Sequence, residues 1–182
     1  MNDSDSERCR AARIAADEAR RWAARRQTWI TAALTKMLIL QGNANNDVAR
    51  TLRLSRREVK RHARTPLLPY AIAKGQPLTH LTAVQSAVDD VVHHESGFTA
   101  DELWDWARIY DGEHGRLAHT QCDAGDTVER ALADVELYGK RLRDTTLDDV
   151  TRATVSRKLR LAEARARTFG AAGNTIELAH RH

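Results

Sequence analysis

The sequence predicts an all-α fold, and two observations support this prediction. Apolar residues recur at the 3.6-residue spacing of helices along most of the chain, and no window alternates apolar and polar residues for long. Ser or Thr followed three residues later by Glu, the capping-box pattern of helix N-termini, stands before two of the predicted helices. A chain of 182 residues holds one compact domain or two small ones, and it needs neither a disulfide nor a metal to fold.

Two helices are expected before the first turn. Residues 7–26, within a basic N-terminal segment at 1–27, form a helix with a stripe of Ala12, Ala15, Ala16, Ala19, Trp22 and Ala23. The arginines around this stripe either lie along DNA phosphates or are simply solvated, and they are Arg8, Arg10, Arg13, Arg20, Arg21, Arg25 and Arg26. Residues 28–41 form the second helix, stopped by Gly42, with inward-facing Ile30, Leu34, Met37 and Leu38.

Residues 42–54 predict a short helix between two turns. The helix begins at about Asn46 or Asp47, and Asn45 or Asn46 caps its first amides. The interior receives apolar side chains from one face of this helix and from the turn after it, namely Val48, Ala49, Leu52 and Leu54.

A second short helix is expected from Ser55 to Arg64. Ser55 and Glu58 form a capping box at its start, and Val59 faces inward. The outside of the helix carries five cations, Arg56, Arg57, Lys60, Arg61 and Arg64. Cations this close repel one another and add nothing to folding, so they indicate an anionic partner. A helix fits the major groove of DNA, where Arg binds guanine and other cations hold phosphates.

This stretch resembles the LuxR/FixJ-type helix-turn-helix of bacterial response regulators and, more loosely, region four of sigma factors. The family spacing is matched over about residues 30–64 by Gly42, Asn45, Val48, Ala49, Leu52, Leu54, Ser55, Val59, Lys60 and His62. The resemblance implies that the helix from Ser55 to Arg64 is a recognition helix, with Lys60 on the DNA side. Glu58 stands where the family usually has threonine, and ARTPLLP follows where the family has a dimerisation helix. The resemblance therefore supports DNA binding rather than a two-component regulator.

A proline-containing linker at 66–78 is expected to separate the helix-turn-helix domain, residues 28–65, from an acidic helical module at 79–146. Helices are predicted in the module at 79–95, 99–110 and 126–142, with a Gly- and Asp-rich loop over 111–125. Thr99 and Glu102 open the second of them, and the inward residues of the first are Leu81, Val84, Val88 and Val91 or Val92.

The C-terminal segment, residues 147–182, is expected to hold a basic helix over 147–169 and a loose tail after Gly170. The inward side of that helix comprises Val155, Leu159, Ala162, Ala166 and Phe169.

Charge is distributed unevenly along the chain. Residues 1–65 carry a net charge of +8, residues 79–150 of −10 and residues 151–182 of +5. This asymmetry indicates an anionic partner for the N-terminal third and another task for the middle. Residues 127–140 space Val128, Leu132 and Val135 like the third helix of a winged-helix domain. Because an acidic surface repels phosphates, a dimerisation or partner-binding module is favoured over a second DNA-reading domain.

Other kinds of site are not favoured. Five residues have side chains that could bind zinc, namely His93, His94, His114, His119 and Cys122. Their spacing is looser than that of structural zinc sites, so solvated loop histidines are the preferred interpretation. Trp104 and Trp106 point in different directions on one helix, so core packing of both with partial exposure is preferred, and the alternative places Trp106 at an interface. With no phosphate loop, nucleophile elbow or buried acid/base pair in the sequence, neither an enzyme nor a cofactor is predicted.

The sequence also predicts a cytoplasmic protein. The apolar run from Trp29 to Leu40 is about half the length of a membrane span and contains Lys36. Cys9 and Cys122 lack paired spacing, so free thiols are expected.

Together these observations predict a sequence-specific transcriptional regulator of bacterial, phage or plasmid origin. Its partners are double-stranded DNA and further copies of itself, as a homodimer or higher homo-oligomer through the C-terminal helices. Phosphate contacts are expected from Arg50, Arg53 and Arg64, and base contacts from the helix that Ser55 opens, through Arg56, Arg57, Lys60 and Arg61. The alternative is a DNA-packaging or recombination accessory subunit, such as a phage terminase small subunit, which a ring of eight or more copies would indicate. A protein-interaction adaptor is the third interpretation, and it predicts no DNA binding.

Overall fold

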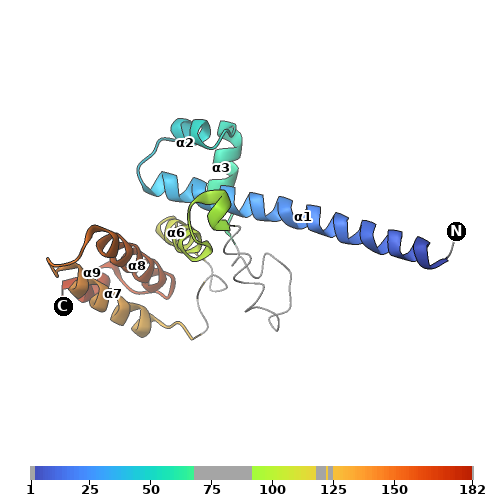
Figure 1. Cartoon of the computed structure of the whole chain (residues 1–182). Helices are drawn as coiled ribbons and strands as arrows, with labels where there is room; N and C mark the ends of the chain where they lie inside the picture. The colour runs from blue at the N-terminus through green and yellow to red at the C-terminus, as the bar shows by residue number, and fades with distance from the viewer. Residues whose placement is uncertain (1–2, 68–91, 118–121, 123–124, 182) are drawn as a thin grey trace.

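The computed structural model describes residues 3–67, 92–117, 122 and 125–181, and the fold is all-α (Figure 1). The helices are α1 (Asp3–Leu40), α2 (Asn45–Thr51), α3 (Arg56–Arg64), α6 (Ala100–Glu113), α7 (Val128–Leu142), α8 (Asp149–Thr168) and α9 (Gly173–Arg181). Residues 92–96 are also helical, and no strand occurs in the described ranges. Most of the predicted linker at 66–78 and of the predicted helix at 79–95, with Leu81, Val84, Val88 and Val91, lies outside the described residues.

The first helix, α1, is continuous over 38 residues, so the prediction of separate helices at 7–26 and 28–41 was wrong. The predicted boundary falls at Gln27 and Thr28, neither of which is a Gly or Pro that would end a helix. The Thr28 hydroxyl instead donates to the Ala24 carbonyl, one turn earlier in α1, at 2.9 Å. At 1.5 Å per residue α1 is about 57 Å long. Its C-terminal part from Trp29 onward packs against other helices, whereas its N-terminal half projects from the rest of the chain (Figure 1).

The turn after α1 covers Gln41 and Gly42, and Gly42 has a φ of 87°, as expected of the residue predicted to stop the helix. The predicted asparagine cap of the next helix was wrong, because α2 begins at Asn45 with Ala44 as N-cap and has no side-chain cap. Asn43 instead caps the C-terminal end of the preceding helix, α1. The Asn43 side chain donates to the Leu38 carbonyl at 2.9 Å, and its backbone amide donates to the same oxygen at 3.1 Å.

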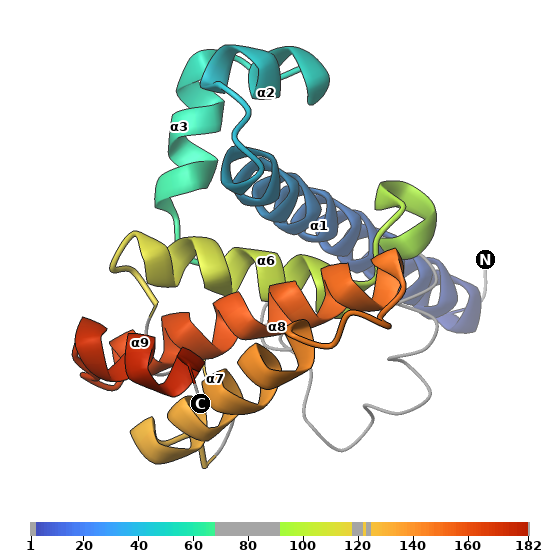
Figure 2. The ribbon, with the colours of Figure 1, turned by 90° about the vertical axis from the view of Figure 1, so that its left-hand side faces the viewer.

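Helices α2 and α3 lie on one side of the C-terminal part of α1 and α6 lies on the other (Figures 1 and 2), and each side packs through its own apolar cluster. On one side α2 and α3 pack through buried Val48, Ala49 and Val59 and partly buried Leu38, Ile39, Leu52 and Leu54, which confirms the predicted inner face. On the other side α6 and the short helix at 92–96 pack through Trp29, Ile30, Ala33, Val92, Leu103 and Ala107. Burial of these side chains away from water holds α1 between the two groups.

A buried ion pair also joins α1 to α6. The Lys36 ammonium donates to the Asp111 carboxylate, and both side chains are 0% exposed. The start of the loop predicted over 111–125 was wrong. Helix α6 continues to Glu113, so Asp111 lies within its last turn. Burial lowers the pKa of Lys36, and the Asp111 carboxylate opposes this effect.

The remaining helices form one packed group in which α8 lies between α6 and α7 (Figure 2). The predicted inner face of α8 is confirmed, with Phe169 half-buried and with Val155, Leu159, Ala162 and Ala166 buried. The predicted loose tail after Gly170 was wrong, because α9 packs on α7 and buries Ile176.

Close approach of α9 to α7 depends on a glycine. A Cβ added at Gly139 would lie 2.9 Å from the ring of His180, so only glycine admits the helix this closely. The Arg143 guanidinium donates to the His180 carbonyl at 2.8 Å and closes the contact.

Candidate nucleic-acid interface

The start of α3 is fixed by a capping box, as predicted. The Ser55 hydroxyl accepts a hydrogen bond from the Glu58 amide at 3.2 Å, and the Glu58 carboxylate accepts one from the Ser55 amide at 2.8 Å. These bonds satisfy two amides that the first turn of a helix leaves unpaired. Hydrogen bonding from the Ser55 backbone holds the pKa of Glu58 below its usual value, so this carboxylate stays charged.

The inner face of α3 consists of Val59, His62 and Ala63, all buried. Burial lowers the pKa of His62 and the neighbouring Arg61 lowers it further, while Glu58 acts in the opposite direction. The imidazole is therefore neutral at pH 7, and it packs as part of the domain interior. The histidine that matches the LuxR/FixJ-type spacing therefore has a packing role in this structure.

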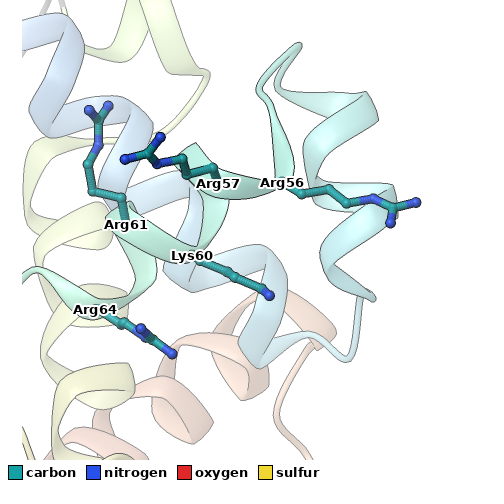
Figure 3. Close-up of a pocket in the computed structure, with 5 residues that line it drawn as sticks. All are labelled: Arg56, Arg57, Lys60, Arg61 and Arg64. Atoms are coloured by element: carbon teal, nitrogen blue, oxygen red, sulfur yellow. The ribbon is translucent and has the colours of Figure 1, made fainter.

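The outer face of α3 holds the five predicted cations, and all five are exposed. Figure 3 shows their side chains spreading from this face of the helix. They line a shallow hollow of about 440 Å³ whose residues are Arg56, Arg57, Lys60, Arg61 and Arg64. We call these five residues the α3 cationic face.

No member of the α3 cationic face forms an ion pair with a carboxylate in the described part of the chain. The cations of α8 behave differently. Arg157 lies 3.0 Å from Glu102, and Arg160 lies 2.8 Å from Glu113. Arg165 also pairs with Asp134 of α7. The basic C-terminal segment thus neutralises carboxylates of the acidic module, whereas the charge of α3 is left facing solvent.

The other predicted contact residues lie on the same three-helix unit but outside this hollow. Arg50 is exposed and its guanidinium is 3.3 Å from the carboxylate of Asp47. Arg53 is exposed in the turn between α2 and α3, where its φ of 54° is rare for a residue with a Cβ. The hydroxyl of Ser55 is occupied by its cap. The structure therefore brings together five of the eight predicted residues.

The potential metal ligands do not converge in the described ranges, where no group of three or more His, Cys, Asp or Glu could hold an ion. His93 and His94 are exposed on the short helix at 92–96, and His119 lies outside the described residues. His114 stacks on the ring of Tyr110 with centroids 4.0 Å apart. Cys122 is half-buried.

The two tryptophans of α6 are both half-buried. Trp104 packs against the α1–α6 cluster, and the guanidinium of Arg160 lies 5.8 Å from the ring centroid of Trp106. Trp106 is thus partly covered by a cation from α8.

Sequence reasoning missed Asp111, the partner of Lys36. A lysine within an apolar helical run requires a buried anion, so Lys36 was the available signal, but the sequence does not show which carboxylate supplies it. None of the helices in the described part of the chain is both long and apolar enough to cross a membrane. Comparison with family models, with curated proteins and with solved structures found no match for the chain.

Proposed function

We propose that the protein is a sequence-specific DNA-binding protein that inserts α3 into the major groove of a duplex. The observation that carries this proposal is the α3 cationic face, five exposed cations on nine residues of helix with no carboxylate partner among the described residues. Uncompensated charge of this density destabilises an isolated helix, and a polyanion relieves it.

The shape of the three-helix unit supports the same function. Four residues separate α2 from α3, the length of turn found in helix-turn-helix motifs. At 1.5 Å per residue α3 is about 14 Å long, and its diameter fits a major groove about 12 Å wide. The likeness of residues 42–62 to the LuxR/FixJ-type motif supports α3 as the recognition helix and favours transcriptional regulation as the biological role.

We assign two kinds of contact to these cations. Arg56, Arg57, Lys60 and Arg61 reach base edges, because they project from the first two turns of a recognition helix. Arg50, Arg53 and Arg64 lie at the margins of the unit and hold phosphates. Self-association through the C-terminal helices would double the contacts, and the exposed apolar side chains of Leu137 and Leu178, 52% and 58% exposed, support such an interface.

Selection of binding sites from random DNA duplexes tests the proposal directly. The expected result is enrichment of one short motif, which would be repeated about 10 base pairs apart if two copies bind together. Recovery of all sequences alike would contradict sequence-specific reading by α3.

Paired variants locate the contact. Arg57→Ala combined with Lys60→Ala should weaken binding to the selected site by at least about 30-fold, since each of the two base contacts is worth about 1–3 kcal/mol. The matched control, Lys140→Ala with Arg141→Ala, removes the same two charges from exposed positions on α7. It should leave affinity within about twofold of the wild type. Equal losses in both variants would indicate a general charge effect and refute a role for α3.

Replacement of the capping-box carboxylate, Glu58, should change DNA affinity in the opposite direction. Glu58→Gln keeps the capping box, because glutamine serves at that position, and removes a negative charge beside the α3 cationic face. DNA affinity should rise at low salt while the thermal unfolding midpoint changes little. A fall in affinity would place the carboxylate itself among the DNA contacts.

A further inference from the structure

The N-terminal half of α1 carries a second set of cations that the α3 contact does not use. Four of its arginines form one row along the helix, and we call Arg10, Arg13, Arg20 and Arg21 the α1 arginine row. The row is about 17 Å long, because it spans 11 residue steps of 1.5 Å. Each of its members is exposed.

The direction of the row follows from the continuity of α1. Arg20 and Arg21 precede Leu38 and Ile39 by 18 residues each, which is about five helical turns. The other two members precede the same two residues by about seven and about eight turns. Because Leu38 and Ile39 pack against α2 and α3, the whole row lies on the side of α1 that carries these helices.

The opposite side of α1 has a different composition. Ala15 precedes buried Ala33 by 18 residues, so it extends the side that packs on α6. Arg8 precedes the same Ala33 by 25 residues, about seven turns, and is exposed on that opposite side. The arginine row is therefore a property of one side of α1, and Arg8 is a natural reference position.

Local ion pairing among the described side chains leaves most of the row without a carboxylate. Asp17 pairs with Arg20 at 2.6 Å, but these side chains are 48% and 76% exposed and such pairs are weak in water. Among the described residues no ion pair involves Arg10, Arg13 or Arg21. The cost of this repulsion is not offset by packing, since residues 6–16 of α1 are exposed on all sides.

The projecting part of α1 is nevertheless attached firmly to the domain. The Arg26 guanidinium binds the Glu95 carboxylate through two hydrogen bonds of 2.7 and 3.2 Å. Trp29 and Ile30 are buried within the next turn. Since α1 has no break, its N-terminal half continues the direction of the part that packs against α2 and α3 (Figure 1).

We propose that the α1 arginine row is a second DNA-binding surface, which holds the phosphate backbone of the same duplex beside the site read by α3. The inference rests on the proposed function, because it is the position of α3 that brings a duplex to this side of α1. Phosphates form a continuous line of single charges, and guanidinium groups spaced along one side of a helix can bind several of them. The row holds the backbone without reading bases, so it adds affinity and leaves the preferred sequence unchanged.

The test measures affinity against salt concentration for a variant in which all four arginines of the row become glutamine. Each neutralised phosphate contributes about 0.9 to the slope of log affinity against log salt, so the slope should become shallower by about 0.9 for each phosphate that the variant no longer binds. Affinity should fall by a similar factor for the selected duplex and for a random duplex, and the selected motif should be unchanged. Circular dichroism verifies that the variant keeps its helix content, and native mass spectrometry verifies that it keeps its assembly state.

Single variants supply the positional control. Arg13→Gln and Arg8→Gln remove the same charge from exposed positions on opposite sides of α1. Only Arg13→Gln should lower the slope, whereas Asp17→Asn, which removes an anion from the row's side, should raise affinity. Equal effects of the two arginine variants would overturn the proposal, because they would show a general charge effect.

The outcomes separate this proposal from the proposed function. If the four-arginine variant binds like the wild type while Arg57→Ala with Lys60→Ala abolishes binding, the second surface is refuted and the role of α3 stands. If the α1 variant alone loses binding, the proposed role of α3 is refuted and α1 is the DNA contact. If neither variant changes binding, both proposals are overturned.

Discussion

Replacement of Lys36 by methionine would break the buried ion pair between α1 and α6 and leave the Asp111 carboxylate in the interior. The two side chains are completely buried, so water cannot enter to solvate the remaining charge without a change in packing. Removal of one partner of a buried pair costs about 3–5 kcal/mol. Domains of this kind are stable by about 5–15 kcal/mol, so the variant should lose about a fifth or more of its stability.

The magnitude comes from the loss of the Lys36 cation beside a buried carboxylate rather than from the attraction within the pair, and a double variant tests this point. Lys36→Met with Asp111→Leu removes both charges and keeps apolar volume. Its free energy of unfolding should lie within about 1 kcal/mol of the wild type, since apolar replacement of a buried pair is often neutral. Urea denaturation followed by circular dichroism gives all four values of the double-mutant cycle. Additive losses in the double variant would refute the reasoning, as would single variants that cost under about 1 kcal/mol.

The pH dependence of the Asp111→Leu variant provides an independent check. The pKa of Lys36 is lowered in the fold by burial, and the carboxylate that opposes this effect is removed in the variant. Between the folded pKa and the unfolded value of 10.5, the unfolded state binds more protons, so stability should rise with pH in that window. The double variant lacks Lys36 and should not show this rise.

Three further predictions concern the α2–α3 unit. Ser55→Ala removes the hydroxyl that caps α3 and should lower the free energy of unfolding by about 1 kcal/mol, whereas Ser55→Thr should keep most of the wild-type stability. Equal free energies of unfolding for the two variants in urea denaturation would contradict the role of the cap. Arg53→Gly relieves a positive φ and should raise stability by up to about 1 kcal/mol while it weakens DNA binding; a loss of stability would be the contrary result. His62 has a lowered pKa in the fold, so stability should be full above pH 6.5 and fall as the pH drops through the folded pKa; His62→Gln should flatten this dependence between pH 5 and 7.

The sequence by itself determined the local features of the α2–α3 unit. Gly42 marks the turn after α1, and the pairs Ser55–Glu58 and Thr99–Glu102 form the predicted capping boxes. The cations of α3 were assigned to its outer face because Val59 fixed the inner one. These features depend on hydrogen bonds and spacings within a few residues, so a single sequence contains the information that specifies them.

Other features depend on the tertiary structure. The sequence could not show that Lys36 meets Asp111, 75 residues away, or that α9 packs on α7 through the close contact at Gly139. A helix of nine residues such as α9 is marginal alone and is stabilised by its neighbour, which no local pattern reveals. Pairing of α8 arginines with the acidic module likewise required the packed helices. Which cations remain free for a partner was therefore decided by helix packing, because packing determines which carboxylates come within reach of each cation.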